Sequence, residues 1–230
     1  PDISRRFADA AIELVCEQSQ RPFFIHVNFT APHDPLLWPP GFEDTYSSED
    51  IPAPPNFLAE HPFDHGNLRG RDEQLLPWPR TIEDVREELA VYYAVISHMD
   101  QQIGRILKEL GDRGLADNTV VIFTSDHGLA IGSHGLRGKQ NMYEHTVGVP
   151  LIMAGPGISA GETCPAQLYL RDLYPTVCEL AGIAIPDVLE GKSIVPVLRG
   201  ESEAIHPHVL CYFRDSQRMI RDDRWKLIFY

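Results

Sequence analysis

The sequence predicts an α/β fold, in which a mostly parallel sheet is flanked by helices and a small antiparallel sheet follows near the end of the chain. Residues 119–124 are almost all β-branched or aromatic, which is typical of a strand covered on both faces. A long amphipathic helix leads into this strand through a short connection, as in a parallel sheet. From residue 208 onward, alternating apolar and polar residues indicate two or three antiparallel strands.

The first third of the chain contains a predicted helix, a predicted strand and a long irregular segment. Apolar residues recur at helical spacing over residues 3–18, and residues 23–29 (FFIHVNF) have the composition of a strand. Residues 32–79 contain more than half of the 19 prolines, which remove main-chain donors and restrict their neighbours. We expect no regular structure there, and loops of this length are usually functional or disordered.

The long helix is expected to begin at Thr81, which together with Asp84 resembles a capping box. Spacings of four and three residues alternate along it and place its apolar residues on one face. Gly111 and Gly114 are expected to end it. The apolar positions are 85, 89, 92, 96, 99, 103, 106 and 110.

Three further elements are expected after residue 150. Residues 151–154 form a short predicted strand, and residues 168–182 form a predicted helix that is interrupted near Pro175. Asp222 and Asp223 are expected to form the hairpin turn between two of the C-terminal strands.

Length and composition limit the possible functions. The formal net charge of −13 argues against nonspecific nucleic-acid binding, and no apolar stretch approaches the roughly 20 residues of a membrane span. The four cysteines show no C-x-x-C spacing, so neither a zinc knuckle nor a disulfide scaffold is indicated. We assign residues 1–204 to an α/β domain and residues 205–230 to the beginning of an antiparallel subdomain.

Polar residues come directly after the strand predicted at residues 119–124. Asp126 and His127 stand where open α/β sheets bind ligands, and a carboxylate with a neutral imidazole can hold a divalent cation. The alternative is a strand-end turn that the Asp side chain caps. The glycine-rich loop beyond them carries further polar residues, and its cations indicate an anionic substrate. These residues are His134, Arg137, Lys139, Glu144 and His145.

An ordered set of residues in this region resembles the sulfatases of the alkaline phosphatase superfamily. It comprises Ser125-Asp126-His127-Gly128, Gly132, Gly135, Lys139, Tyr143-Glu144 and Val149-Pro150-Leu151-Ile152. The resemblance implies an alkaline phosphatase-like fold, of which residues 1–204 would be the latter part of the α/β domain. It also implies that the C-terminal antiparallel subdomain is truncated at residue 230.

The resemblance implies roles for four residues. Asp126 and His127 would help to bind one divalent cation, which is Ca²⁺ in this family. Lys139 would stabilise negative charge on the sulfate as the S–O bond breaks. His33 would contact the sulfate and could protonate the departing oxygen as a general acid. The neighbouring Asp34 would either tune His33 or cap the turn.

Six residues are weaker candidates for contact with the substrate. Some come from the proline-rich segment and some from the glycine-rich loop, and structural alternatives stay open for three of them. Arg69 and Arg71 can be solvated surface charges, and Glu144 can form a buried ion pair with Lys139. The six residues are Arg69, Arg71, His134, Arg137, Glu144 and His145.

The nucleophile of the family is missing from this sequence. Family members convert the Cys or Ser of a C/S-x-P-x-R segment into formylglycine, whose hydrated form attacks sulfur. No Cys or Ser here has that spacing and both ends of the chain look cut, so we expect these 230 residues alone to be inactive. The resemblance implies a sulfated small molecule or saccharide as substrate and a formylglycine-generating enzyme as partner of the full-length protein. It also implies a periplasmic or secreted location.

Other classes stay open at this point. A phosphate or phosphonate ester hydrolase of the same superfamily could use a similar site, whereas a two-zinc phosphodiesterase needs a D-x-x-x-H element that the sequence lacks. A noncatalytic module could also keep the fold for binding alone. A C/S-x-P-x-R segment in the parent open reading frame would favour the enzyme, and its absence would favour the binding module.

Overall fold

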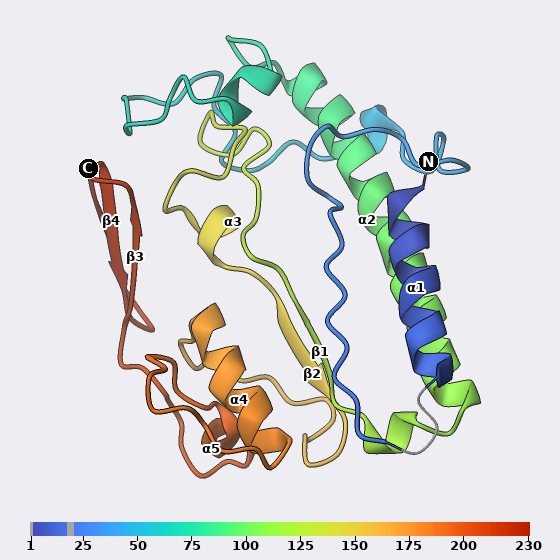
Figure 1. The fold of residues 1–230 in the computed structure, drawn as a ribbon. Helices are drawn as coiled ribbons and strands as arrows, with labels where there is room; N and C mark the ends of the chain where they lie inside the picture. Colours follow the sequence, from blue (N-terminus) through green and yellow to red (C-terminus); the bar gives the residue numbers. More distant parts are fainter. Residues whose placement is uncertain (1, 18–20) are drawn as a thin grey trace. The chain divides into compact units, whose positions relative to one another are not determined.

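The computed structural model describes residues 2–17 and 21–230 (Figure 1). The chain divides into two compact units. The first unit contains Pro1–Pro62, Glu73–Thr119 and Ile131–Arg137. The second contains Phe63–Asp72, Val120–Ala130 and Gly138–Tyr230. The boundary predicted between residues 204 and 205 stays a prediction. Short 3-10 helices occupy Ser48–Asp50, Asp72–Leu75, Ala116–Asn118 and Leu170–Asp172.

Two helices dominate the first unit, and both were predicted. Helix α1 spans Ile3–Glu17 and packs along α2, which spans Ile82–Asp112 (Figure 1). The buried side of α1 carries small residues, including Ala8 and Ala11, which let the two helices approach closely. The last residue of the helix predicted at 3–18 lies outside the described residues. Gly114 follows the end of α2 at a φ of +66°, which explains why the helix stops there.

The start of α2 is fixed by the side chain of Thr81. Its hydroxyl oxygen accepts a hydrogen bond from the main-chain N–H of Asp84 at 3.0 Å. We expect Thr81→Ala to lower the free energy of unfolding by about 1 kcal/mol, because one main-chain donor loses its partner. Thr81→Ser keeps the hydroxyl and should differ from the wild type by only a few tenths of that. Denaturant unfolding of both variants checks this, and an unchanged midpoint for Thr81→Ala would contradict it.

The prediction of a strand at residues 23–29 is wrong, because these residues pair with no other strand of the described chain. This segment lies in no sheet of the described chain, and its side chains alternate between exposed and half-buried. Its aromatic residues still attract packing partners, since the ring of Phe29 meets that of Phe7 edge-to-face at 6.3 Å. Strand-forming composition alone is insufficient, because a strand also needs a neighbour that accepts its main-chain hydrogen bonds.

The second unit contains both sheets of the described chain, and both are antiparallel. Strand β1 (Val121–Thr124) pairs with β2 (Leu151–Ala154), so that Val121 faces Ala154 and Thr124 faces Leu151. All four residues of β1 are half-buried, whereas we expected a fully buried strand. A mostly parallel sheet is therefore not confirmed within residues 2–17 and 21–230, because the only described neighbour of β1 runs in the opposite direction.

Three helices lie in the second unit: α3 (Glu144–Val147), α4 (Leu173–Leu180) and α5 (Val195–Leu198). Pro175 does not interrupt α4, contrary to our expectation. It lies in the first turn, where a helix needs no main-chain donor. No helix of the described residues is long and apolar enough to cross a membrane.

The C-terminal antiparallel sheet is confirmed. Strands β3 (Val209–Phe213), β4 (Gln217–Arg221) and β5 (Lys226–Phe229) are hydrogen-bonded in that order. Asp222 makes the predicted turn between β4 and β5, where its carboxylate accepts a hydrogen bond from the N–H of Arg224 at 2.8 Å. The local chemistry of an Asp at a turn thus fixes this register.

Candidate active site

The turn after β1 is tied to the segment before β2. The hydroxyl of Thr124 donates a hydrogen bond to the main-chain oxygen of Pro150 at 2.8 Å. Two residues beyond Asp126, the N–H of Gly128 donates to the oxygen of Thr146 at 2.9 Å. The Ser125 hydroxyl donates to the oxygen of His127 at 3.0 Å. The predicted metal-binding pair therefore lies on a turn whose two sides are both fixed.

Gly128 is required by a close main-chain approach. A Cβ atom at this position would lie 1.9 Å from the main-chain oxygen of His145. We expect Gly128→Ala to destabilise the protein by about 1–3 kcal/mol, because one of the two segments must move. Gly104→Ala is the matched control, since nothing lies within 4 Å of that Cβ, and it should stabilise α2 by about 0.5–1 kcal/mol. Thermal unfolding of both variants checks this, and equal effects would contradict it.

Asp126 and His127 form a pair that could bind one cation. The Nε2 atom of His127 lies 3.3 Å from Oδ2 of Asp126, and the Asp126 side chain is 79% exposed. The other ring nitrogen of His127 lies 3.2 Å from the oxygen of Gly128, a contact that fits a protonated Nδ1 and leaves Nε2 as the ligand. An imidazole nitrogen and a carboxylate oxygen this close together could both bind the same cation.

The pair does not by itself choose the metal. Among residues 2–17 and 21–230, no group of three or more His, Cys, Asp or Glu side chains could hold an ion. A carboxylate suits Ca²⁺ or Mg²⁺, whereas an imidazole is more usual for transition metals. These two residues therefore supply part of a coordination shell, and the choice of Ca²⁺ rests on the resemblance.

Lys139 lies beside a polar network that sequence reasoning missed. The main-chain oxygen of its neighbour Gln140 accepts a hydrogen bond from the Gln217 side chain at 2.9 Å, and the Gln140 amide donates to Asp72 at 2.7 Å. Gln217 is fully buried and comes from β4. Strand β4 and the loop before residue 73 thus hold the main chain next to Lys139, although no short motif marks these contacts.

The two candidate arginines of the proline-rich segment lie in the second unit. Arg69 is exposed. Arg71 pairs with Asp72 at 2.6 Å and is 63% exposed, so this ion pair contributes little to stability. Their contact with the substrate stays a prediction.

Glu144 connects α3 to the C-terminal sheet. Its carboxylate pairs with Lys226 at 3.1 Å and also with Arg221. Burial raises the pKa of Glu144, but the hydrogen bonds and charges of Lys226 and Arg221 outweigh it and hold the pKa below its usual value. The ring of the neighbouring His145 lies 5.8 Å from that of Tyr143. These contacts give Glu144 a structural role, and substrate contact by either residue stays a prediction.

His33, His134 and Arg137 belong to the first unit. His33 lies on a turn in which its N–H donates to the oxygen of Thr30 at 2.9 Å, and its side chain is 48% exposed. His134 has a left-handed φ of +56°, and its Nε2 lies 3.0 Å from the amide nitrogen of Asn56. Burial and the neighbouring His61 lower the pKa of His134. A neutral His134 can accept or donate one hydrogen bond but adds no charge for binding an anion.

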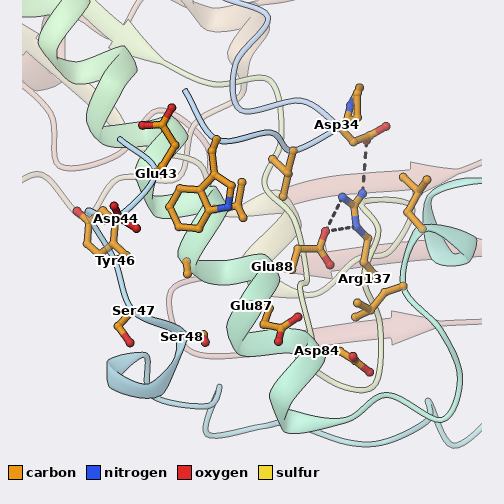
Figure 2. A pocket seen from close by; sticks show the side chains of 17 residues that line it. Asp34, Glu43, Asp44, Tyr46, Ser47, Ser48, Asp84, Glu87, Glu88 and Arg137 are labelled. Atoms are coloured by element: carbon orange, nitrogen blue, oxygen red, sulfur yellow. Dashed lines mark hydrogen bonds and ion pairs between the residues drawn. The ribbon is translucent and has the colours of Figure 1, made fainter. Parts of the chain in front are cut away.

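Arg137 is buried among carboxylates (Figure 2). Its Nη2 and Nε atoms lie 2.6 and 2.7 Å from Oε1 of Glu88, and its Nη1 lies 3.4 Å from Oδ1 of Asp34. Its main-chain N–H donates to Glu73 at 2.8 Å. Burial raises the pKa of Glu88, and the charge of Arg137 opposes this shift. With its side chain 2% exposed, Arg137 does not present its guanidinium to solvent, which weighs against the substrate contact predicted from the sequence.

The pocket beside this ion pair is acidic (Figure 2). It has a volume of about 840 Å³ and lies within the first unit. Arg137 contributes the only cation among the described residues that line it, and two carboxylates already pair with that cation. The pocket is therefore unsuited to a sulfate group. Its acidic lining residues are Asp34, Glu43, Asp44, Asp84, Glu87 and Glu88.

The family model described as Sulfatase matches residues 2–183. The chain belongs to the sulfatase family. The predicted metal-binding pair, Lys139 and His33 all lie inside the matched range, so the resemblance seen in the sequence is confirmed.

Relatives of this sulfatase chain include an arylsulfatase and a choline-sulfatase. It is 30% identical to arylsulfatase K of Xenopus laevis over 97% of this chain and 46% of the relative. It is 32% identical to a choline-sulfatase of Rhizobium meliloti over 93% of this chain and 43% of the relative. The chain therefore spans less than half the length of these two relatives.

A solved structure supports the fold. The phosphonate monoester hydrolase of Silicibacter pomeroyi superposes with a TM-score of 0.82 and 25% sequence identity, over 97% of this chain and 50% of that chain. The sulfatase chain thus has the alkaline phosphatase-like fold of that enzyme and of the sulfatases.

Proposed function

We propose that the whole protein containing this chain hydrolyses sulfate esters, with a saccharide or another small molecule carrying the sulfate. The observation that supports this most directly is the Asp126–His127 pair on its fixed turn, in a chain of the sulfatase family. The nucleophile would be formylglycine, made by a formylglycine-generating enzyme from a C/S-x-P-x-R segment. The 230 residues contain no such segment, so the proposal requires one elsewhere in the protein.

The residues of this chain would each supply one part of the reaction. Asp126 and His127 would hold part of the shell of one Ca²⁺ ion, which would polarise a sulfate oxygen. Lys139 would stabilise the charge that develops as the S–O bond breaks. His33 would protonate the departing oxygen, a step that suits an imidazole near neutral pH. We also propose a periplasmic or secreted location, by analogy with the family.

The test is sulfate release by the whole protein, coexpressed with a formylglycine-generating enzyme. The substrate panel contains sulfated saccharides, choline sulfate and aryl sulfates, each measured with Ca²⁺ and after chelation. Asp126→Asn should remove most of the sulfate release. The release that remains should no longer depend on Ca²⁺. Asp117→Asn is the matched control, since this Asp lies in the first unit outside the predicted site. Full activity after chelation and in Asp126→Asn would contradict the proposal.

A phosphonate or phosphate ester hydrolase is the second candidate. The likeness to a phosphonate monoester hydrolase at a TM-score of 0.82 favours it. Phosphonate monoesters and phosphate esters therefore belong in the same panel. Turnover of these esters in preference to every sulfate ester would move the protein to this class. A folded, metal-loaded protein that turns over no ester would instead be a binding module.

A further inference from the structure

The neighbouring side chains of residues 33 and 34 differ in their exposure to solvent. The His33 side chain is 48% exposed, whereas that of Asp34 is only 2% exposed. The Nδ1 atom of His33 lies 2.8 Å from the main-chain oxygen of Asp34 and 3.7 Å from its Oδ1. Because the ring contacts the main chain of Asp34, an anchor on the Asp34 carboxylate also limits how far this turn and the His33 imidazole can move.

The inward carboxylate is held by Arg137. The Nη1 atom of Arg137 lies 3.4 Å from Oδ1 of Asp34, and both side chains are 2% exposed. Because the pair is removed from water, its attraction is screened far less than that of a surface ion pair. An irregular loop without strand or helix hydrogen bonds thus gains a fixed point inside the first unit.

Arg137 is itself held by a helix. Its Nη2 and Nε atoms converge on Oε1 of Glu88, which lies in the second turn of α2 (Figure 2). Its main-chain N–H also donates to the Glu73 carboxylate at 2.8 Å. A site is positioned best when its supporting residues come from rigid elements and are themselves fixed by hydrogen bonds. The contacts therefore run from α2 through Glu88 and Arg137 to Asp34.

We propose that Arg137 and Glu88 are positioning residues that orient His33 through the Asp34 carboxylate. This inference rests on the proposed role of His33 as the general acid. Nδ1 of His33 would donate to the Asp34 main-chain oxygen, so the doubly protonated ring would carry the transferred proton on Nε2. As the S–O bond breaks, its electron pair goes to the leaving oxygen, which takes the Nε2 proton, while the sulfuryl group passes to the hydrated aldehyde nucleophile. The transfer requires the ring to be oriented so that Nε2 faces the leaving oxygen.

Leaving-group dependence separates this role from a merely structural one. A general acid matters for a sulfate ester of a basic alcohol, such as a sugar, but much less for 4-nitrophenyl sulfate, whose phenolate leaves readily. In the whole protein, Arg137→Lys and Asp34→Asn should each lower kcat for a sugar sulfate by about tenfold or more, and kcat for 4-nitrophenyl sulfate by about twofold at most. His33→Ala should show the same selectivity more strongly.

Arg105→Lys is the matched control. Arg105 is also an arginine of the first unit that pairs with a carboxylate, that of Asp9 at 2.6 Å, and its partners Asp9 and Gln102 lie outside the contacts that run from Glu88 to Asp34. It should change kcat for both esters by the same factor. Equal losses on both esters in Arg137→Lys and Asp34→Asn, beside a selective loss in His33→Ala, would overturn the positioning role alone. Equal losses in His33→Ala would overturn the proposed general acid.

The ring of His33 gives a second measurement that needs no turnover. In ¹⁵N–¹H spectra of the imidazoles, with His33 assigned from His33→Gln, the neutral ring of the wild type should show the tautomer protonated at Nδ1. Arg137→Lys and Asp34→Asn should shift this signal toward a mixture of tautomers, and Arg105→Lys should leave it unchanged. A His33 signal that is the same in all four proteins would overturn the inference, whatever the outcome for catalysis.

Discussion

Lys139→Ala is expected to lower kcat for sulfate release by the whole protein about 10²–10³-fold. Removing a cation that faces developing negative charge costs most in the transition state, so kcat should fall further than KM rises. The main chain beside Lys139 is held by Gln217 and Asp72, through Gln140, and the substitution leaves these contacts in place. Steady-state kinetics on the best sulfate ester of the panel measures the effect.

The matched control for this substitution is Lys192→Ala. Lys192 is an exposed lysine of the same unit, and only its main-chain N–H contacts Asp172. Its replacement should change kcat by less than about twofold. The amount of metal bound per protein should be the same in both variants and in the wild type. A Lys139→Ala protein that kept its full kcat would contradict the role proposed for this lysine.

Arg80→Met should lower the free energy of unfolding by about 3–5 kcal/mol, the largest loss of stability that we expect from a single substitution. Arg80 is 2% exposed, and its guanidinium donates to the Glu73 carboxylate at 2.8 Å, to its main-chain oxygen at 3.0 Å and to Leu76. Burial lowers the pKa of Arg80, and the charge of Glu73 opposes this shift. Methionine fills similar space but leaves the Glu73 carboxylate buried without its cation.

Thermal unfolding should place the midpoint of Arg80→Met roughly 6–20 °C below that of the wild type, for a chain of this length. The control is Arg5→Met, because Arg5 faces Asp9 at 4.0 Å with both side chains well exposed. Such a surface pair contributes little, so the midpoint should shift by no more than about 2 °C. Similar shifts of the unfolding midpoint in the two variants would show that the buried Arg80–Glu73 pair contributes no more to stability than an exposed pair.

Local patterns in the sequence were sufficient for several elements. The four-and-three spacing and Thr81 predicted α2, because helix formation depends on neighbours three and four residues away. Two further local signals predicted the C-terminal hairpins: the alternation of apolar and polar residues from residue 208 onward, and Asp222 as a turn residue. The adjacent pair Asp126 and His127 could also be picked out directly, since both lie on one turn.

The sequence by itself therefore determined helices α1, α2 and α4, the C-terminal strands and the family of this protein, because these depend on neighbouring residues or on an ordered motif. Only the tertiary structure decided the partners of each strand and each buried charge. Arg137 looked like a substrate-binding cation, yet its carboxylate partners lie 49 and 103 residues away along the chain. Residues 23–29 looked like a strand but have no partner strand in the described chain. Composition reports the preference of a segment, whereas pairing depends on which distant groups the fold brings within hydrogen-bonding distance.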